Sequence, residues 1–153
     1  MHLSFRAFRW IPVALMGVFL ALNPCATAAA ETKFQARLVW GTDEMKPDKA
    51  NLKEIDDKTK EKLKAVFKWK NYFEVDAQTV VVLPNELKKV KMSNKCDIEI
   101  QDLGEDGFEV KLFGEGKLTK KVKQVFPSGD CLVLAGDDKN ANAWFVMLCP
   151  AGK

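Results

Sequence analysis

The chain has few of the residues on which hydrolytic enzymes and nucleic-acid-binding proteins most often depend. Its 153 residues include one histidine, His2, three arginines and three serines. A histidine in the mature protein is required for Ser-His-Asp and Cys-His catalytic arrangements and for histidine-ligated zinc sites. Nucleic-acid-binding proteins rely on arginine side chains and a clear positive excess. Whether these functions are excluded therefore depends on which part of the chain is retained.

The first thirty residues have the pattern of an export signal. Arg6 and Arg9 precede an apolar run at residues 10–22, and small residues follow up to positions 28–30. A basic start, a short apolar stretch and a small-residue cleavage site together characterise secretory signals. The run is shorter than the roughly 20 residues that span a bilayer. We therefore predict cleavage before Glu31, a periplasmic or secreted protein, and no stable membrane span in the mature chain.

An alternative for the leader rests on Cys25, which would carry a diacyl anchor in a lipoprotein. The two residues before it are Asn23 and Pro24. Both fit poorly where a lipoprotein peptidase accepts small side chains. Cleavage near residue 30 is the preferred interpretation, and lipidation of Cys25 is the alternative.

Removal of residues 1–30 leaves residues 31–153, the size of a single domain, with 22 basic and 21 acidic residues. Such a chain buries roughly two-thirds of its surface on folding, enough for a core of its own. Arg37 is then the only arginine, and no histidine is left. The composition excludes histidine-dependent catalysis and argues against nucleic-acid binding.

Three cysteines remain in the mature chain: Cys96, Cys131 and Cys149. An antiparallel hairpin that pairs Gly136 with Trp144 places Cys131 opposite Cys149. Directly opposed residues lie within disulfide reach, so we predict a Cys131–Cys149 disulfide. The alternative is three small, buried thiols. No C-x-x-C pair is present, which argues against a thiol oxidoreductase.

Apolar and polar side chains alternate along most of the mature chain. The alternation is clearest at residues 34–40, 96–101 and 108–112. This period of two is typical of strands with one buried and one wet face. Residues 132–135 and 144–148 are apolar throughout, which predicts strands covered on both faces.

The remaining pattern completes the prediction of the fold. Residues 72–75 and 79–83 are expected to be two strands joined by a turn at 76–78. An apolar stripe that includes Leu63 predicts one helix at about 57–68. We therefore predict a mainly β protein: a single β-sandwich or partly open barrel of about eight antiparallel strands, with the helix packed on it.

Two lysine-laced segments, residues 87–92 and 117–126, are predicted to be edge strands, because lysine opposes pairing with another chain. If the two strands are neighbours, their lysines form one basic strip that would attract an anionic envelope polymer. The alternative is a pair of solvated edges. The candidate strip comprises Lys88, Lys89, Lys91, Lys120, Lys121 and Lys123.

Two acidic loops are candidates for a catalytic site and for a calcium-binding site. The first contains Asp102, Glu105 and Asp106. Paired carboxylates can act as acid and base in the cleavage of glycosidic bonds. The alternative is a structural turn, because tight turns favour Asp and Gly. The second loop matches the first five positions of a calcium-binding loop but lacks the glycine and the final glutamate of that pattern. The mismatch favours a polar hairpin tip without calcium. The candidate ligands in this second loop are Asp138, Asn140 and Asn142.

Two aromatic residues stand apart from the predicted core. Phe113 follows Leu112 and therefore points away from the face of Phe108, and Trp69 lies between two lysines. Exposed aromatic rings flanked by lysine suit carbohydrate or peptide binding, and capping of the core is the alternative.

The sequence as a whole predicts an exported, non-catalytic binding or structural module of the cell envelope without a cofactor. Its expected partner is an envelope protein or an anionic surface polymer. The alternative is a small carboxylate-dependent hydrolase acting on polysaccharide. That enzyme would need two acidic groups converging in a cleft, drawn from Asp102, Glu105, Asp137 and Asp138.

Overall fold

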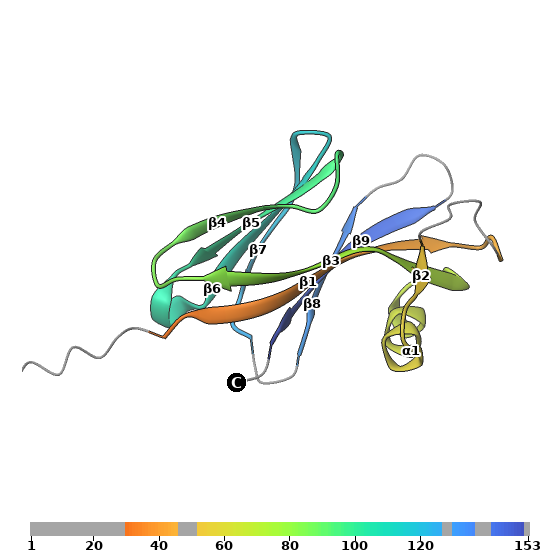
Figure 1. The fold of residues 1–153 in the computed structure, drawn as a ribbon, viewed down its shortest axis with the longest axis horizontal. Coiled ribbons are helices and arrows are strands. Elements are labelled where there is room, and N and C mark those ends of the chain that lie inside the picture. The colour runs from red at the N-terminus through yellow and green to blue at the C-terminus, as the bar shows by residue number, and fades with distance from the viewer. Residues whose placement is uncertain (1–29, 46–51, 127–129, 137–141, 152–153) are drawn as a thin grey trace, which may run out of the picture.

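The computed structural model describes residues 30–45, 52–126, 130–136 and 142–151, and these form two stacked antiparallel sheets (Figure 1). Residues 1–29 of the predicted export signal, Cys25 included, lie outside the described residues. The elements are β1 (Thr32–Thr42), β2 (Lys53–Glu54), α1 (Asp57–Val66), β3 (Asn71–Val82), β4 (Leu87–Lys91), β5 (Cys96–Asp102), the 3-10 helix η1 (Gly104–Asp106), β6 (Phe108–Gly114), β7 (Lys117–Gln124), β8 (Leu132–Gly136) and β9 (Ala143–Pro150).

The sheets have the strand orders β2-β3-β1-β9-β8 and β4-β5-β6-β7. They do not close into a barrel, so of the two predicted architectures the structure has the sandwich. The part of the chain that the structure describes contains no helix with the length and apolar character to cross a membrane.

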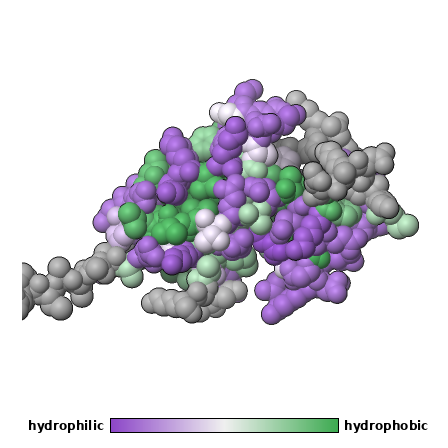
Figure 2. All heavy atoms as spheres, in the orientation of Figure 1, coloured by the Kyte–Doolittle hydropathy of each residue, from purple (hydrophilic) through white to green (hydrophobic). Residues whose placement is uncertain are grey.

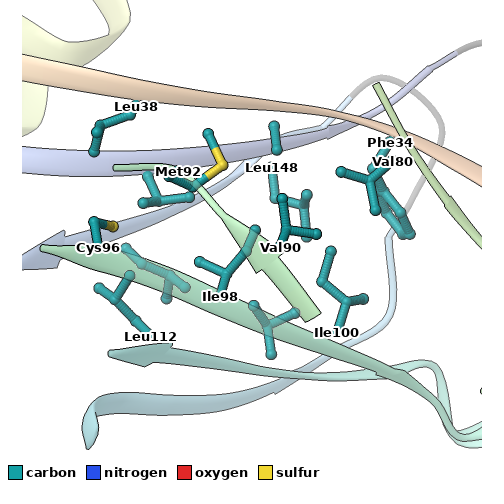
Figure 3. Close-up of a cluster of buried hydrophobic side chains, with 14 of the residues drawn as sticks. Phe34, Leu38, Val80, Val90, Met92, Cys96, Ile98, Ile100, Leu112 and Leu148 are labelled. Atoms are coloured by element: carbon teal, nitrogen blue, oxygen red, sulfur yellow. The ribbon is translucent and has the colours of Figure 1, made fainter. Parts of the chain in front are cut away.

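The main core lies between the two sheets and confirms the predicted alternation (Figure 3). Phe34, Ala36 and Leu38 of β1 point toward the four-stranded sheet, and the residues between them point away. Burial of these side chains is the main force that holds the sheets together. The fully or nearly buried members are Phe34, Ala36, Leu38, Val80, Val82, Val90, Met92, Cys96, Ile98, Ile100, Val110, Leu112, Leu134, Val146 and Leu148.

A second cluster covers the opposite face of the five-stranded sheet, beneath α1. A bulge between Leu38 and Val39 in the β1–β3 pairing leaves both residues buried, one in each cluster. β9 is likewise buried on both faces, as its continuous apolar run predicts. The second cluster consists of Val39, Ile55, Leu63, Trp69, Tyr72, Phe145 and Met147.

The close packing of this cluster requires a glycine in β1. A Cβ atom at Gly41 would lie 2.8 Å from ring atoms of both Phe145 and Trp69. Trp69 is only 8% exposed, so it caps the core and is not a surface platform. Of the two interpretations of Trp69, the structure supports capping of the core and not carbohydrate or peptide binding.

One local prediction, the turn within residues 72–83, is wrong. The expected turn at residues 76–78 is the middle of the continuous strand β3, which pairs with β1 from Asn71 to Val82. The helix predicted at about 57–68 is confirmed at Asp57–Val66, after which Phe67 adopts an extended backbone and packs its ring 4.4 Å from that of Phe145. Packing on the sheet thus outweighs continuation of the helix.

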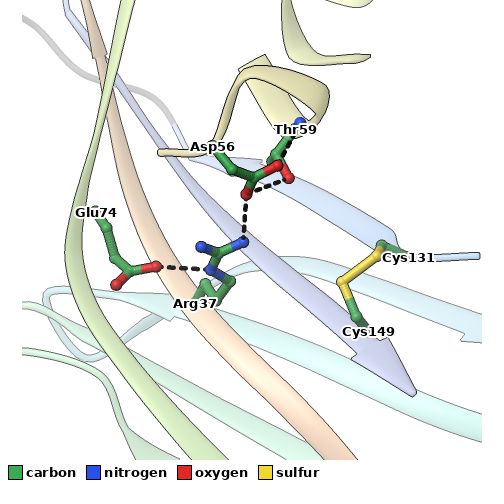
Figure 4. The surroundings of a disulfide bond; sticks show 6 residues. All are labelled: Arg37, Asp56, Thr59, Glu74, Cys131 and Cys149. Carbon is green, nitrogen blue, oxygen red and sulfur yellow. Dashed lines mark hydrogen bonds and ion pairs between the residues drawn. A yellow bond between two sulfur atoms is a disulfide. The ribbon is translucent and has the colours of Figure 1, made fainter. Parts of the chain in front are cut away.

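The start of α1 is fixed to the sheet by a chain of charged groups (Figure 4). Asp56 caps the helix, accepting hydrogen bonds from the Thr59 amide at 2.9 Å and the Thr59 hydroxyl at 2.8 Å. Arg37 donates from Nη1 to Asp56 at 3.3 Å and from Nε to Glu74 at 2.6 Å. The hydrogen bonds from Thr59, and then Arg37, hold the pKa of Asp56 below its ordinary value.

Replacement of Asp56 with alanine is expected to lower the free energy of unfolding by about 1 kcal/mol at pH 7, the usual cost of a lost N-cap. The folded state lowers the pKa of Asp56, so its stabilising contribution is present above the ordinary value of 3.8 and is lost as the pH falls below it. Urea denaturation at pH 7 and pH 3 measures both effects. The matched control is Asp57→Ala, in the same helical turn but not the cap. Equal losses in the two variants, or a loss that does not change with pH, would contradict the assignment.

Candidate binding surfaces

The predicted lysine-laced strands are edges, but they do not form one strip. β4 and β7 are the two opposite edges of the four-stranded sheet, with β5 and β6 between them. Lys88 pairs with Ile100 and Lys120 with Leu112, so these two lysines lie at positions on the inner side of the sheet. The candidate strip is therefore divided between two edges and two faces.

Several lysines on the outer face of this sheet are neutralised by glutamates. Glu99 lies 2.8 Å from Lys89 and 3.8 Å from Lys111. Glu109 lies 3.4 Å from Lys111 and 2.9 Å from Lys121. Lys121, and then Lys111, lowers the pKa of Glu109. We name these five residues the charge ladder; its alternating signs weaken the attraction of this face for a polyanion.

A surface pocket of about 370 Å³ lies at one end of the charge ladder. Phe113 contributes to it, and its side chain points to the outer face as predicted, opposite the 55%-exposed Leu118 of β7. The pocket combines an aromatic ring with charges of both signs. Its principal lining residues are Lys89, Lys91, Asp97, Glu99, Phe113 and Gly116.

The edge of the five-stranded sheet at β3 differs from the lysine-rich edges. β2 pairs with β3 only at Phe73 and Glu74, and no other described strand pairs with β3 on that side. From Val75 to Val82 this edge contains no lysine and no proline, and its single charged residue is Asp76. We call this segment the open edge.

The register shows which backbone groups of the open edge point away from β1, on the side where no other described strand pairs with it. The Ala151 amide donates to the Lys33 carbonyl at 2.8 Å, so Lys33 faces β9, and its neighbour Phe34 faces β3 because direction alternates along a strand. Phe34 pairs with Val80. Even-numbered residues of this part of β3 therefore bond β1, and odd-numbered ones direct N–H and C=O outward. The outward-directed residues are Ala77, Thr79 and Val81.

The acidic loops show no convergent pair of carboxylates within the described residues. Asp102 accepts a hydrogen bond from the Gly104 amide at 2.8 Å and so supports the turn, while Glu105 and Asp106 are exposed in η1. Asp137, Asp138 and Asn140 lie outside the described residues. The structure therefore does not test the calcium-loop assignment, or a catalytic carboxylate pair that includes Asp137 or Asp138. Within the described ranges, no group of three His, Cys, Asp or Glu residues is arranged to hold a metal ion.

The cysteines follow the predicted pairing. A disulfide joins Cys131 to Cys149 (Figure 4). Gly136 pairs with Trp144, as the predicted register requires. Cys96 is a free thiol, 3% exposed, in the main core. Burial, and then the nearby Asp97, raises the pKa of Cys96 to about 12. Since the thiolate is the reactive form, Cys96 is an inert core residue.

Comparison of the chain with protein-family models, with curated proteins and with solved structures finds no match.

Proposed function

We propose that the protein is an exported, non-catalytic binding module of the cell envelope, which holds a partner protein by accepting one of its strands at the open edge. The observation that carries this proposal is the row of outward-directed backbone groups on Ala77, Thr79 and Val81. Such a row hydrogen-bonds an added strand without any side-chain chemistry.

The other three sheet edges support the choice of β3. β4 and β7 are laced with lysines, which oppose strand addition, and β8 is only five residues long. The open edge has no lysine and is not short, whereas proteins generally avoid leaving a long edge strand unprotected. A partner strand at this position explains why it stays unprotected.

The side chains of the open edge indicate what kind of strand fits it. On the outer face they are small and uncharged: Ala77, Thr79 and Val81. A partner strand with small or β-branched residues at alternate positions would pack against them, because opposed side chains on one face are in contact. The Cys131–Cys149 disulfide supports the exported location, since structural disulfides persist in oxidising compartments.

A charge placed on the open edge tests the proposal. Thr79→Lys is expected to reduce capture of the partner from envelope extract by about tenfold, because it adds the edge protection that β4 and β7 have. Immobilised protein is incubated with the extract, and the captured proteins are quantified by mass spectrometry. The matched control is Thr119→Lys, an exposed threonine on the already lysine-rich β7.

A second variant separates charge from strand pairing. Thr79→Pro removes the amide that faces the partner while leaving the β1 ladder bonds in place, since proline is tolerated where an edge N–H faces solvent. Loss of the same captured protein in both Thr79 variants, with the control unchanged, is the expected result. Capture that survives both variants, or that falls equally in Thr119→Lys, would overturn the proposal.

A further inference from the structure

Seven lysines lie on and beside α1, away from the candidate strip. Figure 2 shows hydrophilic surface over this helix. Nearly all of its lysines are exposed, and none forms an ion pair within the described ranges. We call this group the helix lysines: Lys53, Lys58, Lys60, Lys62, Lys64, Lys68 and Lys70.

The arrangement of the helix lysines is unfavourable for the helix itself. Lys58 and Lys62 are four residues apart, as are Lys60 and Lys64, so each pair stacks like charges on one side of α1. Lysines on the four-stranded sheet instead alternate with glutamates in the charge ladder. The helix thus keeps its positive charge open to an external anion.

The acidic residues near α1 do not cancel this charge. Asp56 and Glu74 are already bonded to Arg37, which leaves Asp43, Glu54, Asp57 and Glu61 against seven lysines. A surface with this excess attracts anions additively.

Apolar groups among the helix lysines indicate the kind of anion. Val66 is 74% exposed at the end of α1, one helical turn after Lys62. The Lys68 ammonium lies 4.7 Å from the centre of the Trp69 ring, which is itself buried in the cluster beneath α1, so Val66 is the apolar group that this surface exposes. Lysines that surround an exposed apolar side chain suit the interface of a bilayer, where charges meet headgroups and apolar groups enter the acyl boundary. A fully hydrated polymer offers Val66 no such environment.

We propose that α1 docks the protein on an anionic bilayer, with the helix lysines against phosphate headgroups and Val66 at the acyl boundary. This proposal does not depend on strand addition at β3. It also places the anion-binding surface on lysines other than those of the candidate strip.

Co-sedimentation with vesicles tests the docking. The full chain is expected to bind vesicles of phosphatidylcholine with 30% phosphatidylglycerol more tightly than pure phosphatidylcholine. The triple substitution Lys58→Gln, Lys62→Gln and Lys64→Gln should weaken that binding about a hundredfold, since each lysine near an anionic surface contributes roughly a fivefold factor.

The matched control removes the same charge from the edge strand β7. Lys117→Gln, Lys120→Gln and Lys123→Gln change three exposed lysines outside the charge ladder and should leave binding within about twofold of the unsubstituted chain. All three proteins share residues 1–30, so differences among them report the lysines alone. Far-UV circular dichroism confirms that each is folded.

A further variant separates a bilayer from a polymer. Val66→Ser is expected to weaken vesicle binding several-fold while leaving binding to soluble polyphosphate unchanged, because only the bilayer buries the side chain. If the triple variants in α1 and in β7 lost vesicle binding equally, the effect would come from net charge alone, and the proposal would be overturned. So would preference for polyphosphate over the anionic vesicles, or equal binding to both vesicle compositions.

Discussion

Replacement of Phe34 with alanine is expected to lower the free energy of unfolding by about 4 kcal/mol. The ring is fully buried between the two sheets, with 0% exposure. Its edge contacts place the Phe108 ring at 5.0 Å and the Phe126 ring at 5.1 Å, centre to centre. These aromatic contacts are lost together with the buried area, and the cavity cannot be refilled by strands fixed in their ladders.

Urea or thermal denaturation measures this loss, and Phe113→Ala provides the control. Phe113 is also a phenylalanine in a strand, but it lies half-buried on the outer face of the four-stranded sheet. We expect its replacement to cost about 1 kcal/mol or less. Similar losses for the two variants would mean that the two faces of the sheet are wrongly assigned.

Removal of the Cys131–Cys149 disulfide is expected to cost about 3 kcal/mol, because the bond closes a short loop and restricts the unfolded chain. The double substitution Cys131→Ala and Cys149→Ala removes it. For a domain of this size, the midpoint of thermal unfolding should fall by about 10 °C.

A reducing agent provides the control for this second prediction. Dithiothreitol should lower the midpoint of the unsubstituted protein to that of the double variant and leave the double variant unchanged. Among the described residues the other cysteine, Cys96, is buried in the main core, and it is present in both proteins, so it does not account for the difference. An unsubstituted midpoint that is insensitive to reduction would show that the bond does not stabilise the fold.

The period-two pattern was sufficient to predict the class of fold, the edge strands and the disulfide. The hairpin register followed from counting between Gly136 and Trp144, because each step along a strand reverses the face. Lysine at β4 and β7 marked the edges, because an edge must resist pairing. These features depend on local pattern, which the sequence displays directly.

The features that were missed depend on contacts between distant residues. Residues 76–78 resemble a turn, yet pairing with β1 keeps them in β3. The candidate lysine strip required β4 and β7 to be neighbours, and strand order is not encoded in either segment alone. The open edge was missed for the same reason, since only the strand order shows that no other described strand pairs with β3 there.

The bulge in β1 has a consequence for how the domain loses its structure. Leu38 belongs to the main core and Val39 to the cluster under α1, so one central strand supports both layers. Melting of either layer perturbs the strand on which the other depends. The sandwich and its helix-covered face therefore form a single cooperative unit, in which amide protons of β1 exchange with solvent only when the whole domain opens.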